Sequence, residues 1–157
     1  MMYSHLEFTL ELETGDSHCP FFWEEPEMTN ISTLMTTDVI SFRKETAITD
    51  ALRTLIDHRI SGAPVVDHEN RIVGVVSEVD LLSLFWETNA SVVGDVMTKS
   101  PVCCPVNGPL IDVVDCLMGN NFRRVLIHDG AGKLAGLVSR ADLMPTLLDE
   151  LLRRRSD

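Results

Sequence analysis

Cysteine is scarce in this 157-residue sequence, and its four copies are not spaced as metal ligands. Cys19, Cys103, Cys104 and Cys116 form no Cys-x-x-Cys pair. The chain also lacks a basic segment followed by an apolar run at its start, and no apolar run approaches the ~18 residues of a membrane span. We therefore expect no metal site, no secretory signal and no membrane partner. These absences predict a cytoplasmic protein with reduced thiols.

Positive charge is scarce as well, above all in the first quarter of the chain. The formal net charge is −11, and residues 1–42 contain eight acidic residues without a single Lys or Arg. Nucleic-acid phosphates attract basic surfaces, so this balance disfavours non-specific binding to DNA or RNA. We expect no nucleic-acid partner, although a local basic pocket is compatible with the charge.

Motifs for catalysis are missing. The sequence has no Gly-x-Ser-x-Gly elbow, no Gly-x-x-x-x-Gly-Lys-Ser/Thr loop and no pair of carboxylates beside a base. Its five histidines are scattered. A metal site built from Cys103, Cys104 and His128 would need a convergence in space that the sequence does not predict. We expect a protein that is not an enzyme and needs no cofactor; the alternative is chemistry within the first 30 residues.

An internal repeat is the main feature that the sequence does have. Residues 74–81 and 136–143 share the pattern Gly-x-Val-Ser-x-x-Asp-Leu at an offset of 62 residues. The offset holds without a gap between residues 31–86 and 93–148, with ten identities in 56 aligned positions. Because units of this length are marginal alone, the repeat predicts two copies that share a core.

Each copy has the pattern of a β-α-β-β-α unit. Apolar residues from Ile48 to Ile56 recur at i, i+3, i+4, i+7 and i+8, which predicts an amphipathic helix, and the offset carries this stripe onto residues 110–118. The predicted extended segments are residues 39–40, 63–66 and 72–76 in the first copy, and residues 102–103, 125–128 and 134–138 in the second. A closing helix is predicted from residue 78 to about 86, and from 140 to about 154. The fold class is α/β (α+β), with tandem repeats packed about a pseudo-twofold axis.

The first 30 residues lie outside the repeat. Leu6, Phe8, Leu10 and Leu12 alternate with polar residues, which predicts a half-buried strand at an edge or in an arm that contacts a second copy. We divide the chain into an acidic extension (residues 1–30), a first repeat (31–88) and a second repeat that ends in a helix (89–157).

The repeated Ser-x-x-Asp element has two interpretations. Ser77 and Ser139 stand where a strand gives way to a helix, and an acidic residue three positions later is typical of a capping box worth about 1 kcal/mol. The same junction suits a nucleotide, because a helix N-terminus favours phosphate and the carboxylates of Asp80 and Asp142 can accept two hydrogen bonds from ribose hydroxyls.

Three features together resemble a tandem pair of cystathionine-β-synthase-type (CBS) domains. These are the Leu34-Met35-Thr36 and Val96-Met97-Thr98 segments, the Ala-Pro-Val-Val-Asp strand of residues 63–67, and the two Gly-x-Val-Ser-x-x-Asp elements. The resemblance covers about three quarters of the chain. It implies a paired unit, the Bateman module, that commonly binds adenosine nucleotides and commonly dimerises into a disc.

The resemblance also implies site residues in both copies. Asp80 and Asp142 would bind ribose hydroxyls, and Ser77 and Ser139 would bind the sugar or phosphate. Base contacts would come from Val39, Ile40, Ile60, Ser61 and Ala63 in the first copy, and from Val102, Phe122, Arg123 and Val125 in the second. Arg123, Arg124 and Arg140 are either phosphate partners or solvent-facing arginines.

The resemblance implies a regulatory module that senses an adenosine nucleotide (AMP, ADP, ATP or a related adenosyl ligand) and forms a homodimer. We expect it to act in trans on a protein target that the sequence does not name. The copies differ, because Ser61-Gly62 is replaced by Arg123-Arg124. We expect the second cleft to prefer the ligand with more phosphate, and the first to take a less charged ligand or stay empty. The alternative is a dimeric scaffold that binds no nucleotide, in which Ser-x-x-Asp only caps helices.

Overall fold

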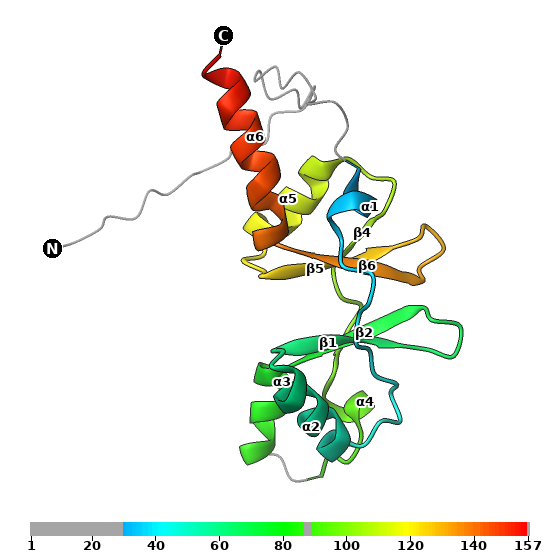
Figure 1. Ribbon diagram of the computed structural model, residues 1–157. Helices are drawn as coiled ribbons and strands as arrows, with labels where there is room; N and C mark the ends of the chain where they lie inside the picture. Colours follow the sequence, from blue (N-terminus) through cyan, green and yellow to red (C-terminus); the bar gives the residue numbers. More distant parts are fainter. Residues whose placement is uncertain (1–29, 87–88, 157) are drawn as a thin grey trace, which may run out of the picture.

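The structure is a computed structural model that describes residues 30–86 and 89–156. The strand predicted for residues 6–12, and the acidic extension as a whole, lie outside the described residues. Figure 1 shows two sheets stacked at the centre of the molecule, with helices on the far side of each sheet. This is the mixed α/β architecture of two tandem repeats.

The first repeat contains the predicted amphipathic helix and the predicted hairpin. Its elements are α2 (Ile48–His58), β1 (Gly62–Val66), β2 (Ile72–Ser77), α3 (Glu78–Leu82) and the 3-10 helix η1 (Ser83–Phe85). Strands β1 and β2 are antiparallel. The closing helix predicted to run to residue 86 is therefore one α-helical turn followed by a tighter 3-10 turn.

The second repeat has the same order and a longer final helix. Its elements are β4 (Cys103–Pro105), α5 (Leu110–Gly119), β5 (Arg124–His128), β6 (Leu134–Ser139), the 3-10 helix η2 (Ala141–Leu143) and α6 (Met144–Arg154). Strand β4 is parallel to β5, and β5 is antiparallel to β6. The helix predicted from residue 140 begins as the 3-10 turn, since regular α-helix starts only at Met144.

The two repeats exchange their first segments, residues 31–36 and 93–98, which we call the leaders. The first leader contains α1 (Ile31–Leu34), yet Ile31 is 1% exposed within the core of the second repeat. The second leader contains α4 (Val93–Val96) and runs into β3 (Thr98–Lys99), which pairs with β2 of the first repeat. Each core is therefore completed by the leader of the other copy. The division of the chain between residues 88 and 89 stays a prediction, which refers to the repeats in the sequence.

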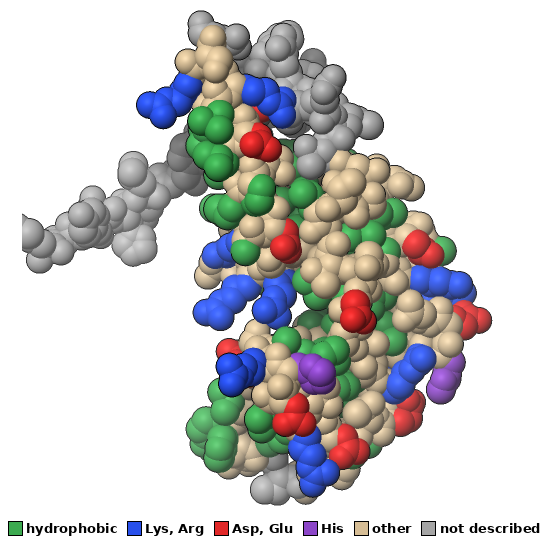
Figure 2. All heavy atoms as spheres, viewed as in Figure 1, with side chains coloured by type: hydrophobic (Ala, Val, Ile, Leu, Met, Phe, Trp, Pro, Cys, Tyr) green, Lys and Arg blue, Asp and Glu red, His purple; other side chains and the backbone are tan. Residues whose placement is uncertain are grey.

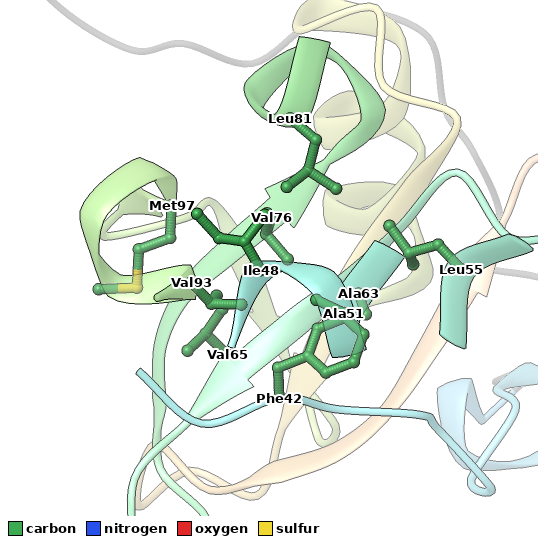
Figure 3. Packing of buried hydrophobic residues seen from close by; sticks show 10 residues of the cluster. All are labelled: Phe42, Ile48, Ala51, Leu55, Ala63, Val65, Val76, Leu81, Val93 and Met97. Atoms are coloured by element: carbon green, nitrogen blue, oxygen red, sulfur yellow. The ribbon is translucent and has the colours of Figure 1, made fainter. Parts of the chain in front are cut away.

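Buried side chains of the first repeat show how the exchanged leader is held. Val93 and Met97 lie in one cluster with Val65, Ile48 and other apolar side chains from α2 and both hairpin strands (Figure 3). Val93 is fully buried and Met97 is 8% exposed. Burying these side chains ties the leader to a core from which it is distant in sequence.

The extended segment predicted at residues 39–40 is not a strand. The chain instead pairs with β1 at Phe42, whose N–H donates to Pro64 O at 2.9 Å and whose carbonyl accepts from Val66 N–H at 2.9 Å. Phe42 is only 6% exposed, so its ring enters the core where it meets the sheet. The equivalent strand β4 begins at Cys103 and leaves Val102 outside.

The hairpins of the two repeats touch at their turns. Ile72 N–H donates to Gly132 O, and Leu134 N–H donates to Asn70 O, each at 2.9 Å. The Asn70 side-chain amide adds a hydrogen bond to Leu134 O. This contact joins the two sheets at one edge of the stack (Figure 1).

Candidate functional site: two strand-to-helix junctions

The capping box predicted at the end of β2 is present. The N–H and the hydroxyl of Ser77 both donate to Asp80 Oδ2 at 2.7 Å, and Asp80 N–H points back to Ser77 Oγ at 3.5 Å. These bonds fix the carboxylate at the start of α3, a helix of only five residues. Because so short a helix has little dipole, the chemistry of the junction rests on the carboxylate itself.

The junction after β6 has the same geometry. Ser139 donates from its N–H and hydroxyl to Asp142 Oδ2 at 2.7 Å, and Asp142 N–H lies 3.4 Å from Ser139 Oγ. In each repeat one carboxylate oxygen is therefore used by serine, and the other points away from the cap.

The second carboxylate oxygen distinguishes the two junctions. Asp80 Oδ1 accepts a hydrogen bond from Thr98 Oγ at 3.2 Å, across the exchanged leader. Among the described residues, Asp142 Oδ1 has no such partner. Both lone pairs of Asp142 Oδ1 are therefore available to a ligand, whereas Asp80 Oδ1 is shared.

Thr98 contacts the first junction, a contact that the sequence did not lead us to expect. The threonine recurs at the repeat offset as Thr36, and this recurrence is the signal that could have identified it. Its contact with Asp80 depends on the leader exchange, which brings it to the other repeat's junction.

In both repeats the segment before the first hairpin strand is tied to the junction. Glu78 N–H donates to Ser61 O at 2.8 Å, and Arg140 N–H donates to Arg123 O at 3.2 Å, two bonds related by the repeat offset. The structure thus brings residues 60–61 and 122–123 beside Ser-x-x-Asp, as the predicted site requires.

The predicted base-contacting residues of the first repeat are mostly covered. Val39, Ile40, Ile60 and Ser61 are half-buried, and Ile40 and Ile60 pack against the core. Ala63 is 3% exposed, and its side chain packs within that core.

Those of the second repeat present more apolar surface. Val102 is 44% exposed and Phe122 is 38% exposed, so both offer a face on which a flat ring could rest. Val125 is 1% exposed and, like Ala63, belongs to the core.

Arginine is concentrated at the second junction. Arg123 and Arg124 are exposed where the chain enters β5. Figure 2 shows a recess at the left edge between the two halves, with basic side chains along its upper side. No arginine stands at the equivalent Ser61 and Gly62, so the two junctions differ in charge.

The Arg140 guanidinium is directed to the end of α5. Its Nη2 donates to Leu117 O at 3.2 Å and to Asn121 Oδ1 at 2.9 Å. Its Nε is buried without a hydrogen-bond partner in the described part of the chain. Of the three candidate phosphate partners, Arg140 is thus engaged by carbonyl oxygens, while Arg123 and Arg124 face solvent.

Across residues 30–86 and 89–156, no helix has both the length and the apolar character needed to cross a bilayer. Within the same residues, His, Cys, Asp and Glu side chains form no group of three or more that could hold a metal ion.

A model of the CBS domain matches residues 31–87 and 93–149, together more than half of the chain. The chain belongs to the CBS domain family. Both matched segments begin at an exchanged leader and include a Ser-x-x-Asp junction, so this CBS pair has its two copies in tandem.

Relatives of this CBS pair include both short proteins and longer enzymes. It is 28% identical over 150 residues to the CBS domain-containing protein CBSX1, chloroplastic, of Arabidopsis thaliana, and the match covers 76% of this chain and 63% of that protein. It is 29% identical over 107 residues to inosine-5'-monophosphate dehydrogenase of Methanocaldococcus jannaschii, covering 68% of this chain and 21% of the enzyme. The CBS pair therefore spans less than two thirds of either relative.

A solved structure has the same fold. The crystal structure of CBSX2 in complex with AMP, a protein from Arabidopsis thaliana, superposes with a TM-score of 0.69 at 32% identity. The superposition covers 76% of this chain and 96% of that one. The expected cytoplasmic location stays a prediction, because the name of CBSX1 assigns that relative to the chloroplast.

Proposed function

We propose that this CBS pair is a regulatory module that binds an adenosine nucleotide beside its Ser-x-x-Asp junctions and acts in trans on a protein target. One arrangement carries the proposal, and it occurs in both repeats. A backbone hydrogen bond holds the segment that is predicted to contact the base (residues 60–61 or 122–123) next to the aspartate carboxylate that the serine fixes in place. The AMP complex of CBSX2, a protein of the same fold at 32% identity, supports it.

The second junction is the stronger candidate for a phosphate-rich ligand. Asp142 Oδ1 can accept ribose hydroxyls, and the exposed faces of Val102 and Phe122 can enclose a purine. Arg123 and Arg124 supply positive charge for phosphate oxygens. The first junction has none of that charge and shares Asp80 Oδ1 with Thr98, so it suits a less charged ligand or none.

Calorimetric titration with AMP, ADP and ATP tests this assignment. Asp142→Ala should weaken ATP binding at least 10-fold, whereas Asp80→Ala should leave the ATP affinity within about 2-fold, since 1.4 kcal/mol corresponds to a factor of ten. Arg123→Ala should weaken ATP more than AMP. Asp149→Ala is the matched control, because it removes an exposed carboxylate of α6 that lies outside the junction.

Equal losses for Asp80→Ala and Asp142→Ala with every nucleotide would contradict the unequal sites. Absence of heat, and of any thermal stabilisation, with all three nucleotides would contradict nucleotide binding altogether. A nucleotide at 100 times its dissociation constant should stabilise the fold by about 2.7 kcal/mol, so a thermal-shift screen detects binding independently.

The outer helix faces support the homodimer. In the first repeat Ile56, Val79, Phe85 and Trp86 are 71%, 72%, 81% and 83% exposed. A groove of about 560 Å³ lies between α2 and α3 with η1. Exposed apolar surface of this kind is typical of protein interfaces.

The second repeat exposes a further apolar face along α6. Its exposed apolar residues recur at i, i+3, i+4, i+7 and i+8: Met144, Leu147, Leu148, Leu151 and Leu152. We propose that these faces of two copies bury each other. Light scattering after gel filtration should give twice the chain mass, and Leu148→Glu should reduce it to one chain; a wild-type monomer at high micromolar concentration would contradict the homodimer.

The same face supports the alternative of a scaffold without a nucleotide, because the capping boxes by themselves account for Ser77 and Ser139. A dimer that fails every nucleotide test above would establish the scaffold.

A further inference from the structure

Three cysteines gather where β4 meets α5, and the proposed function makes no use of them. Cys104 Sγ lies 3.3 Å from Cys116 Sγ, and Cys103 precedes Cys104 in β4. Cys104 is 3% exposed, whereas Cys103 and Cys116 are half-buried. At the equivalent positions the first repeat has Phe42 and Thr54, so this thiol pair exists only in the second repeat.

We propose that Cys104 and Cys116 form a reversible disulfide that links β4 to α5. A disulfide needs its sulfurs at about 2.05 Å, so they must approach by little more than 1 Å. The sulfurs already touch, and Cys116 stands on the face of α5 that meets β4.

The oxidant we specify is a small-molecule disulfide such as oxidised glutathione. The Cys116 thiolate attacks one of its sulfurs, forming a mixed disulfide and releasing one small thiolate, which takes up a proton. Cys104 sulfur then attacks Cys116 sulfur; the Cys104 proton leaves, and the second small thiol departs with a proton. Two protein thiols thus lose two electrons and two protons, which one small disulfide gains.

The order of attack follows from burial. Burial and the neighbouring Cys116 thiol raise the pKa of Cys104 to about 12, and Cys104 is closed to solvent. Because the thiolate is the nucleophile, Cys116 reacts first with the external disulfide, and Cys104 resolves the mixed disulfide from the inside.

The location connects oxidation with the second junction. Strand β4 directly follows Val102, and Phe122 follows α5 by three residues, so the disulfide would join the two elements that present the proposed base contacts. This connection rests on the proposed function; the disulfide itself does not. Holding both elements in place should tighten nucleotide binding at the second junction by about 3-fold or more, since less ordering is left to occur on binding.

The experiment treats the full chain with oxidised glutathione and maps its disulfides by mass spectrometry after cleavage before aspartate. Cleavage before Asp112 and Asp115 separates Cys104 from Cys116 unless they are linked. We expect a linked pair of peptides that dithiothreitol separates, and a melting temperature roughly 5–10 °C higher for the oxidised protein.

Matched variants assign the bond. Cys103→Ser should leave the linked peptides unchanged, whereas Cys116→Ser and Cys104→Ala should abolish them. Linkage that survives Cys116→Ser, or that needs Cys103, would overturn the proposal. So would wild-type protein that stays fully reduced, a result that needs no variant to fold. A disulfide that forms without any change in nucleotide affinity would overturn only the connection with the second junction.

Discussion

The first leader crosses the second sheet at Gly136, where the backbone of the leader leaves no space for a side chain. A Cβ added there would lie 2.7 Å from Thr36 O and 2.9 Å from Met35 Sδ. Thr36 is held in place by two hydrogen bonds with Leu137, one in each direction, at 2.9 and 3.0 Å. The methyl group of Gly136→Ala therefore meets a backbone oxygen that can retreat only by losing those bonds.

The magnitude follows from these contacts. An extra methyl in a filled core costs about 1–3 kcal/mol, and a weakened backbone hydrogen bond adds about 1 kcal/mol. We expect Gly136→Ala to lower the free energy of unfolding by about 3 kcal/mol and the melting temperature by roughly 6–12 °C.

Urea unfolding followed by circular dichroism measures the effect. Gly119→Ala is the matched control, because a Cβ at this last residue of α5 meets nothing within 4 Å and alanine favours helix; it should be neutral or stabilising by up to about 1 kcal/mol. If Gly136→Ala unfolds at the same urea concentration as the wild-type chain, the leader does not cross the sheet at this point.

Two further predictions concern the leader and the hairpin turns. Ile31→Ala should cost about 2–4 kcal/mol in urea unfolding, because the side chain is 1% exposed in the second core; a loss below about 0.5 kcal/mol, comparable to that of exposed Ser32→Ala, would contradict this. Backbone N–H groups of Ala131 and Lys133 lower the pKa of Asp129 below its ordinary 3.8, so its contribution to stability is present above that value and is lost as the pH falls through the lowered pKa. Asp129→Asn should therefore flatten the fall in melting temperature below about pH 4, and an unchanged acid slope would refute the assignment.

Local elements could be predicted because their signals lie within a few residues of one another. The stripe from Ile48 to Leu55 defines α2, and Ser77 with Asp80 defines the cap of α3. The repeat then extends both predictions to the second copy. The stripe does not reveal that Ile56 at its edge is 71% exposed, because an apolar pattern cannot show whether another molecule covers it.

Contacts between residues that are distant in the sequence could not be predicted. Ile31 and Val93 are equivalent apolar residues, and the two cores offer them equivalent places, so a repeated sequence favours neither the exchanged nor the unexchanged arrangement. The contact of Thr98 with Asp80 could not be predicted for the same reason, because it depends on the leader exchange. The direction of Arg140 toward Leu117 O also depends on a packing of α5 against the junction that spacing does not encode.

The leader exchange has a consequence for a severed chain. A fragment ending at residue 86 lacks the Val93 that fills its core, and a fragment starting at residue 89 lacks Ile31. Each fragment carries the piece that the other one needs, which is the condition for reconstitution from complementary halves. The two repeats of this protein therefore depend on each other, and loss of either repeat leaves the other with an incomplete core.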